Sequence, residues 1–175
     1  MPEYCYELKI PHERIAVLIG TDGKVKTDLE KATKTSIRVD SGEGDVSISG
    51  SDPIGLYNTR EIIQAIGRGF NPEVALLLLK QDYCFELINL ADCCRSQNDL
   101  IRLRGRIIGS DGRCRRLIEE LAEVSLSVFG KTVGIIGEAT AVMIARRAVD
   151  SLIRGSTHSK VYQMLERERK KFAGA

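Results

Sequence analysis

The sequence predicts an α+β fold built from two similar units, and three observations support that prediction. Stretches rich in β-forming residues alternate with amphipathic helical stretches in the order β-α-α-β-β-α. The same order occurs twice along the 175 residues. Each time a Gly-x-x-Gly tetrad separates the first two helices, and the second tetrad lies 89 residues after the first. We therefore expect an internal duplication of one folding unit.

The second tetrad lies in a strongly basic stretch. Two glycines three apart allow a tight turn and a close approach of a ligand to the backbone. The amides that open the next helix would point outward and favour a phosphate, and arginines beside them would add forked donors. The stretch consists of Arg106, Ile107, Ile108, Gly109, Ser110, Asp111, Gly112, Arg113, Cys114, Arg115 and Arg116.

The first tetrad matches the second position by position. Beyond the tetrads, Glu30 corresponds to Glu119, and the strand residues after it also match at the same offset. The matching first stretch consists of Ile19, Gly20, Thr21, Asp22, Gly23, Lys24, Val25 and Lys26.

The first unit is predicted to span residues 1–70. We expect a strand at 4–10 that ends at Pro11, a short helix at 12–19, strands at 35–40 and 45–50 around a turn, and a helix from Pro53 towards Gly69. A helix at 24–33 should turn Val25, Leu29 and Ala32 inward. Residues 71–81 are predicted to form a connecting helix.

The second unit is predicted to span residues 82–158. Its expected elements are a strand at 83–90, helices at 100–108 and 113–123, strands at 125–129 and 131–136, and a closing helix after Gly137. In the 113–123 helix, Leu117, Ile118 and Leu121 should face inward. Residues 92–98 form an additional loop that could contact RNA or protein, and residues 159–175 should form a basic amphipathic helix.

The charge is unevenly distributed along the chain. Residues 1–90 carry a net charge of −4 and residues 91–175 carry +6, so we expect the second unit to bind nucleic acid more strongly. No run of about 18 apolar residues predicts a membrane span, and no secretory signal is expected at the N-terminus. Five cysteines without Cys-x-x-Cys spacing favour reduced thiols in a cytoplasmic protein.

The sequence does not favour an enzyme. The stretch Gly20 to Lys24 lacks the Gly-x-x-x-x-Gly-Lys-Ser/Thr spacing of a nucleotide-binding phosphate loop, and no catalytic set or metal-ligand spacing is evident. We therefore predict no catalytic residues, no metal site, no cofactor and no small-molecule substrate.

The two units resemble KH domains, because an Ile-Gly-x-x-Gly segment with a basic residue directly after it joins two helices of a β-α-α-β-β-α unit. The segment 105–112 together with His158, Ser159, Lys160, Val161 and Tyr162 resembles the archaeal "partner of Nob" group of small-subunit ribosome assembly factors. This resemblance implies two tandem type I KH domains, each a three-stranded antiparallel sheet with helices on one face. It also implies binding to the 3′ region of small-subunit ribosomal RNA, with a Nob-type endonuclease and the α subunit of translation initiation factor two as partners.

Several interpretations of the candidate residues stay open. The acidic Asp22 and Asp111 would repel a phosphate from each loop, and the isoleucines could line a base-binding groove or belong to the core. Arg106 could contact the RNA backbone or lie on a solvated face. The predicted RNA-binding residues are Arg106, Ile107, Ile108, Gly109, Ser110, Asp111, Gly112, Arg113, Arg115 and Arg116, with Ile19, Gly20, Thr21, Asp22, Gly23, Lys24 and Lys26 in the first unit.

The alternative function is a protein-interaction adaptor in which the acidic first unit meets another protein. Salt distinguishes the two functions, because phosphate binding weakens steeply as salt rises and an apolar interface does not.

Overall fold

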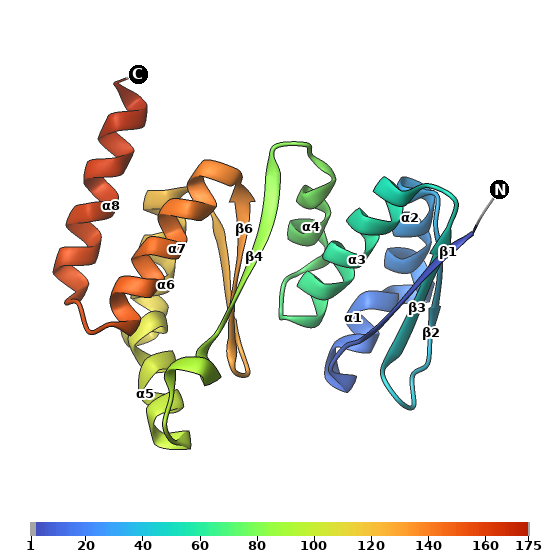
Figure 1. Cartoon of the computed structure of the whole chain (residues 1–175), viewed down its shortest axis with the longest axis horizontal. Helices are drawn as coiled ribbons and strands as arrows, with labels where there is room; N and C mark the ends of the chain where they lie inside the picture. The colour runs from blue at the N-terminus through green and yellow to red at the C-terminus, as the bar shows by residue number, and fades with distance from the viewer. Residues whose placement is uncertain (1–2, 175) are drawn as a thin grey trace. The chain divides into compact units, whose positions relative to one another are not determined.

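The structure is a computed structural model that describes residues 3–174. The chain divides into two compact units, residues 1–81 and 82–175 (Figure 1). With these boundaries the first unit carries 10 basic and 12 acidic residues and the second carries 16 and 12, for net charges of −2 and +4. The excess of positive charge therefore lies in the second unit.

The first unit has the predicted order of elements. Its strands form an antiparallel sheet in the order β1-β3-β2, with helices packed on one face (Figure 1). The elements are β1 (Tyr4–Lys9), the 3-10 turn His12–Arg14, α1 (Ile15–Ile19), the 3-10 turn Thr21–Gly23, α2 (Lys24–Thr33), β2 (Ser36–Val39), β3 (Asp45–Gly50), α3 (Pro53–Gly67), α4 (Pro72–Ala75) and the 3-10 turn Leu76–Leu79.

The closing helix of the first unit begins as its sequence predicts. Asp52 caps α3 by accepting a hydrogen bond from the Ile54 amide at 3.1 Å, and Pro53 occupies the first helical position. Apolar residues at helical spacing are buried against β1 and β3. These residues are Leu56, Ile62, Ile63 and Ile66.

The inward face of α2 differs from the prediction. Leu29 is buried, but Ala32 is exposed and Thr33 takes the inward position. Thr33 is satisfied there because its hydroxyl donates to the Leu29 carbonyl at 2.8 Å and lies 2.8 Å from the Thr35 hydroxyl. The hydroxyl of Thr35 is in turn 3.3 Å from that of Thr59, so a chain of buried hydroxyls joins α2, the residue before β2, and α3. A pattern of apolar spacing cannot anticipate such a polar contact.

The second unit repeats the same topology. Its antiparallel sheet has the order β4-β6-β5, again with helices on one face (Figure 1). The elements are β4 (Tyr83–Asn89), the 3-10 turn Leu90–Cys93, α5 (Gln97–Ile108), the 3-10 turn Ser110–Gly112, α6 (Arg113–Ala122), β5 (Ser125–Phe129), β6 (Thr132–Glu138), α7 (Ala139–Ile153) and α8 (His158–Ala173).

Part of the additional segment of the second unit is helical. Helix α5 begins at Gln97, three residues earlier than predicted, because Ser96 accepts a hydrogen bond from the Asp99 amide and caps the helix. Helix α5 therefore has 12 residues, whereas α1 has five. The 92–98 segment contains the end of a 3-10 turn and this helix start.

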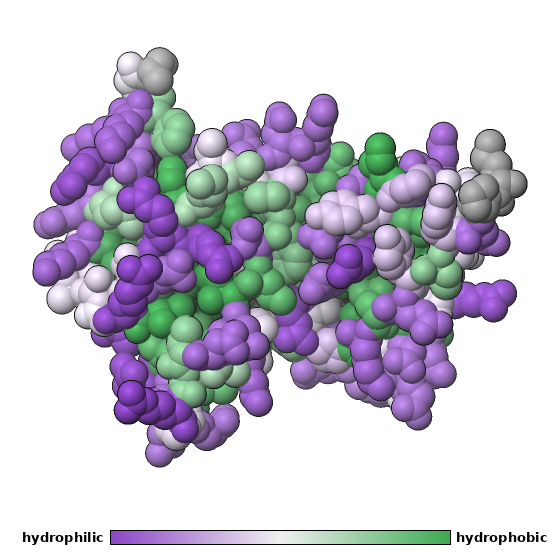
Figure 2. Space-filling model, viewed as in Figure 1, coloured by the Kyte–Doolittle hydropathy of each residue, from purple (hydrophilic) through white to green (hydrophobic). Residues whose placement is uncertain are grey.

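The core face of α6 is shifted relative to the prediction. Ile118 is fully buried, but Leu117 and Leu121 are only half-buried. Cys114 and Ala122 complete the buried row, four residues on either side of Ile118. Helix α8 packs against α6 and α7 through the buried residues Val161 and Leu165. Figure 2 shows mainly hydrophilic side chains over α8, with apolar ones toward its C-terminal end, where Phe172 is exposed.

Candidate nucleic-acid interface

The two Gly-x-x-Gly loops have nearly identical backbones. Gly20 and Gly109 have φ/ψ angles of 75°/176° and 74°/175°, and Gly23 and Gly112 have angles of 73°/13° and 74°/15°. In both loops a 3-10 turn connects the helix before the tetrad to the helix after it. The duplication seen in the sequence therefore extends to the conformation of the loop.

The first glycine of each loop is required by close packing. A Cβ atom on Gly109 would lie 2.7 Å from both the Cβ and the amide nitrogen of Cys114. On Gly20 it would lie 2.4 Å from a methyl group of Val25. Both distances are far below van der Waals contact, so only glycine fits where the loop passes over the following helix.

The second glycine faces open space in the first loop. No atom lies within 4 Å of a Cβ atom built on Gly23. On Gly112 such an atom would lie 3.5 Å from Nη1 of Arg116 and 4.0 Å from Nη2 of Arg115. Two guanidinium groups therefore stand beside the second loop. The first loop lacks the second of these groups because Thr27 occupies the position in the first unit that matches Arg116.

The aspartates in the loops have a conformational role. Asp22 and Asp111 have φ angles of 55° and 54°, in the left-handed region that non-glycine residues seldom adopt. Aspartate tolerates this region better than most residues, because its short polar side chain can bond locally. Both side chains are exposed. The carboxylates that seemed unsuited to a phosphate site thus occupy the strained position of the turn.

The helices that follow the loops begin without a side-chain cap. Gly23 and Gly112 are the N-cap residues of α2 and α6, and neither helix has a capping side chain. Helices α3, α5 and α8 are capped instead by Asp52, Ser96 and Thr157. The first amides of the two helices, those of Lys24 and Arg113, donate to the carbonyls of Thr21 and Ser110 in the preceding turn. The positive end of each helix dipole nevertheless favours an anion near the loop.

One basic residue after each loop is already paired. Arg115 lies 3.0 Å from the Glu119 carboxylate, and Lys26 lies 3.3 Å from that of Glu30. The same two glutamates accept the amides of Leu126 and Ile37, at 2.9 and 2.8 Å. The matching glutamates therefore fix the start of a strand to a helix. The side chains of Lys24, Arg113 and Arg116 are exposed.

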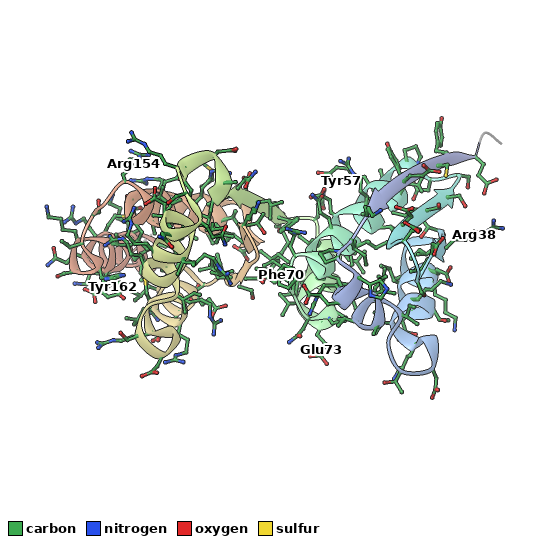
Figure 3. All side chains as sticks on the ribbon, turned by 90° about the horizontal axis from the view of Figure 1, so that it is seen from below. Arg38, Tyr57, Phe70, Glu73, Arg154 and Tyr162 are labelled. Atoms are coloured by element: carbon green, nitrogen blue, oxygen red, sulfur yellow. The ribbon has the colours of Figure 1, made fainter. Side chains whose placement is uncertain are left out.

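Arg106 has structural partners. Its Nε and Nη2 donate to the carbonyls of Leu152, at 3.4 Å, and Ser156, at 2.6 Å. In the first unit Arg14 donates in the same way to the carbonyls of Ile66 and Phe70, each at 2.8 Å. Arg106 thus holds the end of α7, and Arg14 holds the chain just after α3 at Phe70, which Figure 3 labels. To contact an RNA phosphate, the Arg106 side chain would have to give up these hydrogen bonds.

The isoleucines of the two candidate stretches differ in how deeply they are buried. Ile107 is completely buried in the core of the second unit, so its side chain does not reach a ligand. Ile19 and Ile108 are half-buried beside their loops, and Ser110 and Thr21 are exposed at the loop tips. The structure thus brings the polar loop residues to the surface and places Ile107 in the core.

Two residues outside the predicted set also lie at the second loop. Cys114 is buried directly beneath Gly109, and burial raises the pKa of its thiol. The phenol of Tyr162, on α8, donates a hydrogen bond to this sulfur. Burial and this bond raise the pKa of Tyr162 to about 12. The contact depends on how α8 docks, which local sequence patterns do not specify.

Comparisons with known proteins agree with this geometry. Residues 84–170 match a model described as a eukaryotic type KH domain, KH-domain type I, and residues 5–65 match a KH domain model. A KH domain-containing protein of Methanocaldococcus jannaschii is 46% identical over 172 residues, which cover 96% of this chain and 75% of that protein. A pre-rRNA-processing protein pno1 of Schizosaccharomyces pombe is 30% identical, over 89% of this chain and 67% of that protein.

A solved structure extends the similarity to the whole chain. A chain in the a/eIF2alpha-aDim2p-rRNA complex of Pyrococcus horikoshii is 47% identical, with a TM-score of 0.90. The match covers 97% of this chain and 96% of that one.

The chain belongs to the Dim2/PNO1 family of KH-domain proteins. The predicted fold of two tandem KH domains is therefore confirmed. Relatives in this family differ in length, since the chain spans 41% and 42% of two Caenorhabditis pno-1 proteins.

Two structural features are absent from residues 3–174. No helix in this range is long and apolar enough to cross a membrane. Within the same range no three His, Cys, Asp or Glu side chains cluster in a way that could hold a metal ion.

Proposed function

We propose that this protein binds single-stranded RNA through its Gly-x-x-Gly loops, and that the RNA is the 3′ region of small-subunit ribosomal RNA. The Dim2 relative was crystallised with rRNA and the fungal relatives are named as pre-rRNA-processing proteins, which supports this substrate class. A KH loop of this kind clamps the backbone of about four nucleotides.

One observation carries the assignment of the stronger clamp. The guanidinium groups of Arg115 and Arg116 stand within 4.0 Å of a Cβ position on Gly112, whereas nothing stands near Gly23. Guanidinium groups at an uncapped helix start supply full charge and forked donors to a phosphate. The second unit also has the positive net charge. We propose that phosphates bind at Gly109 to Gly112 with Arg113, Arg115 and Arg116.

A protein partner belongs to the same proposal. The complex with a/eIF2alpha supports the α subunit of translation initiation factor two as a partner, and a Nob-type endonuclease remains a second candidate. We propose a binding function without catalysis, since the site offers positive charge and backbone amides. The five free cysteines support a reducing compartment such as the cytoplasm.

Loop variants test the proposal. Ser110→Asp adds a second carboxylate to the exposed tip of the second loop, and Thr21→Asp does the same in the first. Binding of a single-stranded RNA from the 3′ end of small-subunit rRNA should weaken at least about tenfold for Ser110→Asp and less for Thr21→Asp, because repulsion of about 1.4 kcal/mol changes affinity tenfold. Circular dichroism should show both variants folded.

The contrary outcome supports the alternative function. If neither variant changes RNA binding while both retain the fold, the loops are not the clamp. The protein would then act as a protein-interaction adaptor, and its binding to the initiation-factor subunit should persist at high salt.

A further inference from the structure

A cavity of about 360 Å³ lies beside the second Gly-x-x-Gly loop. One wall comes from the loop and the start of α6, and the other comes from the first turns of α8. No residue of the sheet lines the cavity, so it is separate from any groove between α6 and β5. Its lining residues are Gly109, Ser110, Arg113, Cys114, His158, Ser159 and Tyr162.

The α8 wall is held in place by the core of the unit. Thr157 caps α8 by accepting the Lys160 amide at 3.3 Å. Nε2 of His158 lies 2.8 Å from the carbonyl of Arg106, the residue that itself bonds to the end of α7. This hydrogen bond thus connects the start of α8 to α5, the helix that leads into the second Gly-x-x-Gly loop.

Aromatic rings form part of this wall. The rings of His158 and Tyr162 are stacked, with centroids 6.1 Å apart and planes inclined by 25°. The side chain of Tyr162 extends from α8 (Figure 3), and its phenol is hydrogen-bonded to the sulfur of Cys114. A preformed aromatic surface of this kind suits a planar ligand.

The chemistry of the lining matches one nucleotide. Aromatic rings offer a surface on which a base can stack, and stacking is a common way of holding single-stranded nucleic acid. The guanidinium of Arg113 suits a phosphate, and the hydroxyls of Ser110 and Ser159 can bond to a ribose or a base edge. The volume lies at the lower end of the range for small-molecule pockets, which fits a single nucleotide.

We propose that this cavity is a nucleotide subsite, filled by one residue of the same RNA strand that the second loop clamps. Gly109, Ser110 and Arg113 belong to both the loop and the cavity, so a strand leaving the clamp meets the cavity directly. The subsite rests on the proposed RNA-binding function and lengthens the contact made by the second unit. In the first unit the closing helix is followed by the eight-residue segment 72–79, whereas α8 has 16 residues.

The test uses a charge change at the mouth of the cavity. Ser159 is exposed in the first turn of α8, where a carboxylate favours the helix, so Ser159→Asp should fold. Gln163→Glu is the matched control, because it adds the same charge one turn further along α8 at an exposed residue outside the cavity lining. Affinity is measured by fluorescence anisotropy with the rRNA fragment and with versions shortened one nucleotide at a time.

The wild-type protein and Gln163→Glu should lose at least about fivefold in affinity when one particular nucleotide is removed. Ser159→Asp should bind the full fragment at least about fivefold more weakly, and removal of that nucleotide should then cost nothing further. If Ser159→Asp and Gln163→Glu behave alike while Ser110→Asp still weakens binding at least about tenfold, the subsite is refuted and the clamp stands. If the wild type binds no RNA, the proposed function itself fails.

Discussion

The two glycines of each loop are needed for different physical reasons. Both Gly109 and Gly112 have a φ angle of 74°, but Gly109 is in addition confined by Cys114, whereas Gly112 has room for a side chain. The sequence motif cannot separate these reasons, because both positions show the same letter. The packing constraint at Gly109 should therefore affect the stability of the fold more than the open position at Gly112 does.

Alanine substitutions should separate the two roles. Gly112→Ala should lower the free energy of unfolding by about 1–2 kcal/mol, the cost of a left-handed non-glycine residue. Gly109→Ala should cost about 3 kcal/mol or more, because its φ/ψ of 74°/175° lies in a region essentially restricted to glycine and steric overlap with Cys114 adds to that strain. Urea unfolding of both variants measures the difference, and equal losses would show that the crowding at Gly109 relaxes freely.

At the level of single residues, prediction succeeded where the backbone conformation at one position restricts which residue can occupy it. The repeated glycines and aspartates correctly located two turns with matching torsions. Interpretation was less successful for long side chains, since Arg106 has carbonyl partners 46 and 50 residues away in the sequence. Contacts over such separations leave no local periodic signal. Among the neighbouring arginines, Arg102 is exposed and lies 3.8 Å from Asp99.

At the scale of elements, helix α8 packs against α6 and places Tyr162 next to Cys114, beneath the second Gly-x-x-Gly loop. Its start at Thr157 and its amphipathic pattern follow from the sequence, but the pairing of Tyr162 with Cys114 follows only from how α8 packs on α6. The hydroxyl chain of Thr33, Thr35 and Thr59 is a similar case in the first unit. Element boundaries were therefore predictable to within a few residues, while the inward faces of α2 and α6 were only partly so.

The docking of α8 should be visible in the pH dependence of stability. The folded pKa of Tyr162 is about 12 and its ordinary value is 10.0, so the folded protein retains a proton that the unfolded chain releases between these values. This contribution is complete below pH 10 and is lost as the pH rises towards 12. Urea unfolding in reductant should show the stability advantage of wild type over Tyr162→Phe shrinking over that range. A constant difference would mean that Tyr162 is not held as described.

At the scale of the whole molecule, the duplication has produced two loops with one backbone and unequal charge. The matched positions Thr27 and Arg116 differ, and the net charges of the units differ in the same direction. The sequence offset predicted the two copies and their order of elements, because both depend on local patterns. It could not predict that the guanidinium of Arg116 reaches back to Gly112, since side-chain direction depends on the packed helix.

The salt dependence of RNA binding should show whether Arg116 contacts a phosphate. Each phosphate contact on a single strand contributes about 0.7 to the slope of log affinity against log salt. Arg116→Gln should reduce the magnitude of the slope by about 0.7 and weaken binding at low salt. Arg167→Gln, which removes an exposed arginine on α8 outside the loop, is the control and should leave the slope unchanged. Equal slopes for all three proteins would exclude Arg116 as a phosphate ligand.

The paired roles of Arg14 and Arg106 bear on how the duplicated units diverged. Each guanidinium bonds to two carbonyls at the end of its closing helix, yet the 89-residue offset places Arg14 opposite Leu103 and Arg106 opposite Val17. The two copies thus maintain the same bonds from different sequence positions. A position-by-position comparison of the two copies would treat each arginine as peculiar to its own copy, whereas the structure shows the same interaction in both.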